Sequence, residues 1–127
     1  MGKELGEDAE IVMVEINRDA AKAAEENVDM ADAPPKVTIM VGDALDVIPA
    51  LQGPFDFAFI DAKKNDYLMY LKFAENKFHC GTVVVADNAG FRAEQMRDYL
   101  DYVRNSCKYK SRYVQVEDDG LEISVRI

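Results

Sequence analysis

The sequence lacks the features that would place it in several specialised classes. It has only two cysteines among 127 residues, and its longest apolar runs have the length of a strand. Cys80 and Cys107 are far apart and follow no Cys-x-x-Cys or Cys/His spacing, so they indicate free thiols rather than a disulfide or a zinc site. The N-terminus (MGKELGEDAE) has no apolar segment of the signal-peptide kind. We therefore expect a cytoplasmic protein that does not associate with membranes.

Basic charge is scarce as well. The chain has 24 acidic and 15 basic residues, a formal net charge of -9. Such a surface repels phosphate backbones and favours cations or neutral ligands, so we expect no nucleic-acid partner. The apolar content of 49% is enough to fill one core without a disulfide or structural metal. We predict a single domain over residues 1–127.

Strand-sized apolar runs alternate with segments of helical periodicity. The predicted strands cover 10–16, 36–41, 55–61 and 82–87, and the predicted helices cover 17–31, 43–51, 65–78 and 92–107. The run 10–16 is continuously apolar and predicts a strand buried on both faces, whereas Pro34 and Pro35 forbid continuation of the first helix. The last helix should place Met96, Leu100, Val103 and Cys107 on one face. This alternation predicts an α/β fold with a mainly parallel sheet between helices.

The end of the chain has a different pattern. Two strand-like runs, RYVQVE and LEISVRI, flank Asp118-Asp119-Gly120. The Asp-Gly pair between such runs predicts an antiparallel β-hairpin. By fold analogy, a parallel sheet that ends in a hairpin is typical of methyltransferase sheets rather than of ordinary dinucleotide-binding ones.

Acidic residues close the predicted parallel strands. Ligands of an open α/β sheet bind beyond the carboxyl ends of its strands, so these residues are candidates for a site. Taken singly, each acid could instead cap the helix that follows, and for Asp43 capping and ligand binding are equally good interpretations. The strand-end residues are Glu15, Gly42, Asp43, Asp61, Asp87 and Asn88.

Three of these residues suit a divalent cation. If the strands that end at Asp61 and Asp87 are neighbours, about 4.8 Å apart, their carboxylates converge with the side-chain oxygen of Asn88. Oxygen ligands favour Mg²⁺ or Ca²⁺, whereas the single histidine, His79, lies at a predicted helix end away from this edge, where it is structural or solvated. Without a cation the two carboxylates would repel and one would tend to keep its proton, which is the competing explanation.

Lys64 lies three residues beyond Asp61 and can reach the same point. A lysine at the edge of a desolvated site can have a lowered pKa and act as a general base. Most lysines in a Lys-Lys pair are solvated surface groups, as we expect for the neighbouring Lys63. From spacing alone, the surface interpretation of Lys64 is the stronger one.

Three segments together resemble the cation-dependent O-methyltransferases typified by the catechol and caffeoyl-CoA enzymes. The segments are FDFAFIDAKKNDYLMYL, TVVVADNAGF and EDDGLEISVRI. The most specific elements are the Asp-Ala-x-Lys-x-x-Tyr motif from Asp61 to Tyr67, the Asp87-Asn88 pair and the final Asp-Gly-Leu. The resemblance covers essentially the whole chain and implies a Rossmann-like class I fold that uses S-adenosylmethionine.

The resemblance also implies a role for each site residue. It implies that the cation is held by Asp61, Asp87 and Asn88. It implies that Lys64 takes the proton from a hydroxyl of a small acceptor, such as a vicinal diol or a catechol. It implies finally that Glu15 binds the cofactor ribose and that the other cofactor-binding residues are Gly42, Asp43, Ala44 and Asp61.

The family pattern has one element that this sequence does not show. The glycine-rich cofactor loop should lie close to or before residue 1, but Gly2 and Gly6 follow no apolar strand. We therefore expect the first strand of the family sheet and its loop to be missing. In that fold the strand lies between those ending at Glu15 and Asp61, so its loss predicts either a rearrangement or a homodimer across the gap.

Two functional hypotheses follow. The first is an S-adenosylmethionine-dependent, cation-assisted O-methyltransferase. The second is an inactive relic or interaction module that keeps the fold but cannot bind S-adenosylmethionine alone. A phosphate-binding or dinucleotide-dependent protein is less favoured than both, because the sequence has no glycine loop. The family more often has bulkier residues where this chain has Ala89-Gly90-Phe91, so the acceptor pocket is expected to differ.

Overall fold

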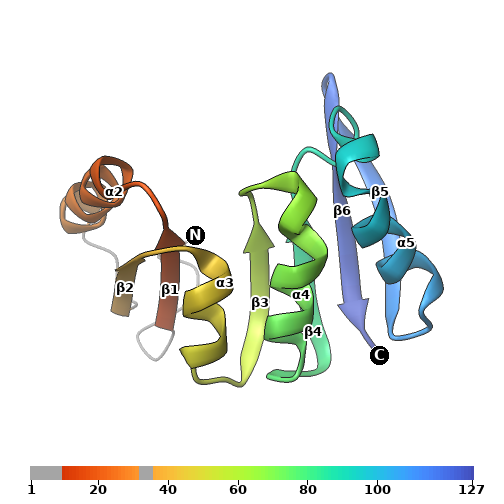
Figure 1. The fold of residues 1–127 in the computed structure, drawn as a ribbon, viewed down its shortest axis with the longest axis horizontal. Helices are drawn as coiled ribbons and strands as arrows, with labels where there is room; N and C mark the ends of the chain where they lie inside the picture. The colour runs from red at the N-terminus through yellow and green to blue at the C-terminus, as the bar shows by residue number, and fades with distance from the viewer. Residues whose placement is uncertain (1–9, 32–35) are drawn as a thin grey trace. The chain divides into compact units, whose positions relative to one another are not determined.

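The computed structural model describes residues 10–31 and 36–127, which form helices and strands in alternation (Figure 1). The chain divides into two compact units, residues 1–50 and 51–127. The single domain over residues 1–127 stays a prediction. No described helix is both long enough and apolar enough to cross a bilayer.

The first unit contains a two-stranded parallel sheet. Strand β1 (Glu10–Glu15) pairs with β2 (Lys36–Val41), residue for residue along their length. The helix between them, α2 (Arg18–Ala31), begins after Asn17, whose side chain accepts hydrogen bonds from the amides of residues 19 and 20. Such a cap satisfies amides that would otherwise lack a partner at a helix N-terminus. A short helix, α3 (Ala44–Val47), follows β2 and continues into a 3-10 turn, η1 (Ile48–Ala50).

The second unit is a four-stranded sheet in the order β3-β4-β6-β5. Strand β3 (Phe55–Ile60) is parallel to β4 (Phe78–Ala86), and β6 (Asp119–Arg126) is antiparallel to both β4 and β5 (Tyr109–Val116). The helices α4 (Tyr67–Glu75) and α5 (Arg97–Asn105) contact each other and lie over one face of this sheet, the near face in Figure 1. The predicted α/β fold, with its parallel strands and final antiparallel hairpin, is confirmed.

The core of the second unit lies between that sheet face and the two helices. Alternate residues of β4 are buried, as a strand with one covered face requires. The helices contribute large side chains to the same core, which the solvent does not reach. These fully buried helical residues are Tyr67, Leu71, Met96, Tyr99 and Val103.

Several element boundaries differ from the predictions. Helix α4 ends at Glu75 and β4 already begins at Phe78, which the sequence placed in the helix. The helix predicted over 92–107 is a 3-10 turn, η3 (Ala93–Met96), followed by α5. Cys107 is exposed and lies beyond the helix with φ 65°, so its place on the buried face was wrong. Strand β1 is not buried on both faces, since Val12 and Met13 are exposed.

The hairpin turn lies two residues earlier than the Asp-Gly pair that predicted it. Glu117 and Asp118 form the turn, with Glu117 at φ 55°, whereas Asp119 and Gly120 begin β6. Gly120 is required for space, because a Cβ built there would overlap the ring of Tyr113. The Asp-Gly pair therefore predicted the hairpin correctly, although the pair lies in β6 and does not form the turn.

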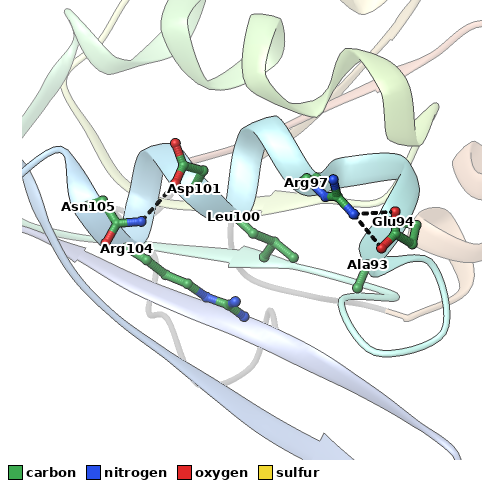
Figure 2. Close-up of a pocket in the computed structure, with 7 residues that line it drawn as sticks. All are labelled: Ala93, Glu94, Arg97, Leu100, Asp101, Arg104 and Asn105. Carbon is green, nitrogen blue, oxygen red and sulfur yellow. Dashed lines mark hydrogen bonds and ion pairs between the residues drawn. The ribbon is translucent and has the colours of Figure 1, made fainter.

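A buried ion pair connects α5 to the sheet. The carboxylate of Glu122 in β6 is 0% exposed and accepts two hydrogen bonds from Arg104, of 2.8 and 3.0 Å. Ser111 Oγ donates a third, of 2.6 Å. Figure 2 shows Arg104 reaching from α5 towards the strands. Since a buried carboxylate is costly unless it is paired, this contact fixes α5 on the sheet.

The ion pair predicts an asymmetric loss of stability. Arg104→Ala should lower the free energy of unfolding by about 3 kcal/mol, because it leaves a buried carboxylate without its cation. Glu122→Gln should cost only about 1 kcal/mol, because Arg104 is 43% exposed and regains water. Urea unfolding followed by circular dichroism measures both values. A larger loss for Glu122→Gln would contradict this account.

Candidate functional site

The carboxyl ends of β3 and β4 lie next to each other. Ile60 pairs with Ala86 in the parallel ladder, and the amide of Asp87 donates a hydrogen bond of 3.0 Å to the carbonyl of Ile60. Asp61 and Asp87 each follow directly after these paired residues. The prediction that these two strands are neighbours is therefore confirmed.

Lys64 lies beside this strand end rather than in solvent. It is the first residue of the 3-10 turn η2 (Lys64–Asp66), and its side chain is 14% exposed. Its Nζ donates hydrogen bonds of 2.7 Å to Tyr67 Oη and 3.1 Å to the Ala62 carbonyl, and lies 3.4 Å from Asp61 Oδ1. The surface interpretation is wrong for Lys64, whereas its neighbour Lys63 is exposed as expected.

The charge state of Lys64 differs from that of a free general base. Burial acts to lower the pKa of Lys64, but its hydrogen bonds to Tyr67 and Asp61 outweigh burial and raise the pKa above its ordinary value. Burial also raises the pKa of the Tyr67 hydroxyl. The pair therefore consists of an ammonium group and a neutral phenol, with the ammonium held against Asp61.

Tyr67 joins the two strand ends. Its side chain is fully buried, and its Oη accepts from Lys64 while donating a hydrogen bond of 3.3 Å to the carbonyl of Asp87. Its ring packs edge-on against Tyr99 at 5.8 Å between centroids. The sequence motif from Asp61 to Tyr67 contained this residue without indicating a role for it.

The loop after β4 is folded around a carboxylate from the hairpin. Asn88 has φ 64°, a left-handed conformation that asparagine adopts more readily than most residues, and its Nδ2 donates a hydrogen bond of 2.7 Å to Asp119 Oδ2. The other oxygen of Asp119 accepts from the amides of Phe91, Gly120 and Gly90, at 2.8, 2.8 and 3.2 Å. The hydrogen bond from Phe91, followed by that from Asn88, lowers the pKa of Asp119 to about 2.

The sequence did not single out Asp119, because the Asp-Gly pair was assigned to the turn. It lies 31 residues beyond Asn88, and only the antiparallel pairing of β4 with β6 brings the two together. The hydrophobic and polar alternation of LEISVRI specifies a strand but not its partner. No local pattern therefore predicted this contact.

The predicted cation ligands at this strand end are oxygen donors, which are the ligands that hard divalent cations prefer. Asp87 Oδ1 accepts a hydrogen bond of 2.8 Å from the Asn88 amide, which leaves Asp87 Oδ2 and Asn88 Oδ1 without a hydrogen-bond donor among the described residues. Within those residues there is no cluster of three or more His, Cys, Asp or Glu side chains suited to a metal ion. The predicted ligand set instead consists of two carboxylates and one amide, and water molecules would complete the coordination shell of a cation.

His79 lies away from this set, as predicted. It is the second residue of β4, whereas Asp87 follows the last, so the two lie at opposite ends of the strand. His79 Nε2 is 2.6 Å from Asp56 Oδ1 on the surface. A hydrogen bond with the Cys80 carbonyl, followed by that with Asp56, raises the pKa of His79.

The predicted cofactor residues Glu15, Gly42, Asp43 and Ala44 lie in the first unit. The Gly42 amide donates a hydrogen bond of 2.9 Å to the Glu15 carbonyl, which joins the ends of β1 and β2. Asp43 caps α3 by accepting a hydrogen bond of 3.0 Å from the Leu45 amide, so the capping interpretation is confirmed. Glu15 Oε1 accepts from the Asn17 amide at 3.1 Å. Their cofactor roles stay predictions, and Gly2 and Gly6 lie outside the described residues.

A hollow along η3 and α5 contains none of the predicted site residues (Figure 2). The charges along it are already paired, Arg97 with Glu94 at 2.6 Å and Arg104 with Glu122. Asn105 donates to Asp101 in the same hollow. We assign no ligand to it. Its lining residues are Ala93, Glu94, Arg97, Leu100, Asp101, Arg104 and Asn105.

Comparison with known proteins gives a consistent result. A family model described as O-methyltransferase matches residues 1–123. Catechol O-methyltransferase from Niastella koreensis is 36% identical over 92 residues, which cover 69% of this chain and 42% of that protein. Catechol O-methyltransferase B from Danio rerio is 35% identical over 130 residues, 92% of this chain and 48% of that protein. The chain thus spans less than half the length of these two relatives.

Solved structures have the same fold. The O-methyltransferase TomG from Streptomyces achromogenes, solved in complex with SAM and involved in tomaymycin synthesis, has a TM-score of 0.90 and 25% sequence identity to this chain. The match covers 98% of this chain and 65% of that one. The Rossmann-like methyltransferase sheet implied by the sequence is therefore confirmed.

Tyr67 and Tyr99, whose rings pack edge-on, predict different effects of removing a hydroxyl. Tyr67→Phe should lower the free energy of unfolding by about 1 to 2 kcal/mol, since two hydrogen bonds are lost and one of them is to a charged group. Tyr99→Phe should leave stability unchanged or raise it slightly, because the buried Tyr99 hydroxyl has no partner among the described residues. Chemical denaturation of both variants tests this. Equal losses would show that the hydrogen-bonded Tyr67 hydroxyl contributes no more to stability than the unpartnered Tyr99 hydroxyl.

Proposed function

This chain belongs to the O-methyltransferase family, and from that premise we propose that it takes part in S-adenosylmethionine-dependent methylation of a hydroxyl on a small catechol-like acceptor. The main support is the arrangement at the ends of β3 and β4, where Lys64 and Tyr67 connect Asp61 to the backbone of Asp87. The names of the similar proteins, two of them catechol O-methyltransferases, favour that acceptor class.

In this proposal Asp61, Asp87 and Asn88 hold a divalent cation, Mg²⁺ or Ca²⁺. Their oxygens are hard ligands of the type these ions prefer. Bound there, the cation would act as a Lewis acid that lowers the pKa of the acceptor hydroxyl and stabilises its anion. A soft-metal site is not supported, because the two cysteines and the histidine lie elsewhere.

Lys64 is the proposed general base. The hydrogen bonds to Tyr67 and then Asp61 raise its pKa, so it becomes a base only when the stabilisation of its ammonium form is reduced. Positive charge near Asp61 would have that effect, since like charges favour the neutral amine. Tyr67 would then keep the amine directed at the strand end through the 2.7 Å contact with Nζ.

The proposed cofactor contacts come mainly from the first unit. Glu15 has a second carboxylate oxygen that can accept hydrogen bonds from the ribose hydroxyls. Gly42, Asp43 and Ala44 are proposed to line the adenine, and Asp61 to add a further cofactor contact. Asp43 can do so while capping α3, because the cap uses only Oδ1. Rate acceleration would come chiefly from holding the acceptor oxygen in line with the methyl group.

The test is methyl transfer from S-adenosylmethionine to catechol in the presence of Mg²⁺. We expect transfer that chelation abolishes and that Asp87→Ala reduces about a hundredfold or more, since a metal ligand should matter at least as much as its outer-shell partners do. Asp56→Ala is the matched control, because Asp56 is an exposed carboxylate on β3 that pairs with His79. Transfer that persists after chelation would remove the cation from the proposal.

The rival function is an inactive relic or interaction module. Calorimetric titration of the chain with S-adenosylmethionine, with and without Mg²⁺, separates the two hypotheses. Binding at micromolar strength supports the enzyme. Absence of binding, with the chain folded, would favour the rival.

We also propose that the chain forms a homodimer through the free edge of β3. Among residues 10–31 and 36–127 this strand pairs only with β4, and its Phe57 and Phe59 side chains are 44% and 56% exposed. An unpaired strand edge with apolar side chains favours pairing with another strand. The other expectations, a cytoplasmic location and the absence of a nucleic-acid partner, rest on the free thiols and the negative charge.

The dimer has a direct test. Sedimentation equilibrium should give twice the chain mass of 14.3 kDa. Replacing Phe57 by Lys should shift the mass towards the monomer, because a charge on an edge strand opposes pairing. The control Phe91→Lys should leave the mass unchanged, because Phe91 is also exposed but lies outside the strands. A monomeric wild-type chain would contradict the proposal.

A further inference from the structure

The carboxylate of Asp119 uses its two oxygens for different partners. Oδ1 accepts from three backbone amides, those of Gly90, Phe91 and Gly120. Oδ2 accepts from the side-chain amide of Asn88 at 2.7 Å. The contacts at Oδ1 hold the loop after β4, and the contact at Oδ2 holds the side chain of Asn88.

The contact at Oδ2 determines the orientation of the Asn88 amide. An ionised carboxylate can only accept hydrogen bonds, so Asn88 must present its NH2 group to Asp119. The carbonyl oxygen of the same amide then faces away from Asp119. No hydrogen bond among the described residues uses that oxygen, and Asp87, the next candidate ligand, is adjacent in the chain.

We propose that Asp119 is a positioning residue that orients Asn88 so that its side-chain oxygen is presented to the cation site. The inference rests on the proposed function, since Asn88 is a ligand only in that proposal. Asp119 itself does not contact the cation. It acts from β6 through the 2.7 Å hydrogen bond to Asn88.

Asp119→Asn separates this role from simple support of the loop. The substituted side chain keeps one oxygen for the three backbone amides, so the loop retains its acceptor. Its new NH2 group would meet the NH2 group of Asn88, and two donors cannot form a hydrogen bond. Asn88 should therefore rotate its oxygen towards position 119 and present its NH2 group to the cation site. An amide NH2 group does not coordinate a cation.

The measurement is Mn²⁺ binding to the purified chain, followed by electron paramagnetic resonance. We expect Asp119→Asn to weaken Mn²⁺ binding about tenfold or more, as is typical when an outer partner of a metal ligand is lost. Asp118→Asn is the matched control, because it removes the same charge from the adjacent exposed turn residue. The exchanged variant N88D/D119N should regain affinity relative to D119N, since its amide at 119 can donate to the carboxylate at 88.

A second readout does not need the cation. In the ¹⁵N-¹H spectrum, one side-chain amide proton of Asn88 should be shifted downfield and slow to exchange in the wild type. It should lose both properties in D119N. If the wild-type chain does not bind Mn²⁺, the cation part of the proposed function fails, and this spectrum alone decides whether Asp119 orients Asn88.

Two results would overturn the inference. One is Mn²⁺ binding by D119N that equals that of D118N. The other is an Asn88 amide proton that exchanges freely in the wild type or does not respond to D119N. A fall in thermal stability without either change would show that Asp119 supports only the loop.

Discussion

The parallel register between β3 and β4 determines where the proposed cation ligands Asp61 and Asp87 lie. The ladder ends with the hydrogen bond from the Asp87 amide to the Ile60 carbonyl, and this contact places Asp61 and Asp87 beside each other. Since side chains alternate along a strand, a shift of one residue would turn one of these carboxylates to the opposite face. Tyr67 reinforces the register from outside the ladder, because its hydroxyl connects Lys64 on one side to the Asp87 carbonyl on the other.

Two carboxylates of β6 show how burial and partner decide what an acid does. Glu122 is buried and paired with a guanidinium, so its contribution is to hold α5 on the sheet. Asp119, three residues earlier, has no ion pair with a basic side chain among the described residues and instead accepts from backbone amides and from Asn88. With four hydrogen-bond donors directed at its carboxylate, Asp119 is the acceptor of the Asn88 hydrogen bond. Strand β6 therefore stabilises the position of α5 through Glu122 and orients the side chain of Asn88 through Asp119.

Much of the fold could be predicted from the sequence, because it depends on periodicities that are local. The apolar runs located the strands, and the residues after each run located the strand ends, including Asp61 and Asp87. Boundaries at helix ends were less accurate, as with Cys107, because helical periodicity continues past Asn105 while the backbone does not. The roles of Tyr67 and Asp119 could not be predicted, since each depends on a contact between residues 20 or more positions apart. The raised pKa of Lys64 could not be predicted either, because sequence spacing does not show how close Tyr67 and Asp61 lie to its ammonium group or how buried that group is.

The division of the chain into two units separates two capacities that an O-methyltransferase needs. All the proposed cation ligands lie in the second unit, which has its own sheet, helices and buried core. The proposed ribose and adenine contacts lie in the first, whose sheet has two strands in the part of the chain that the structure describes. Small sheets bury less apolar surface and are less stable alone, so cofactor binding is the capacity that depends more on additional pairing. The contacts that hold the proposed cation ligands among the described residues all lie within the second unit.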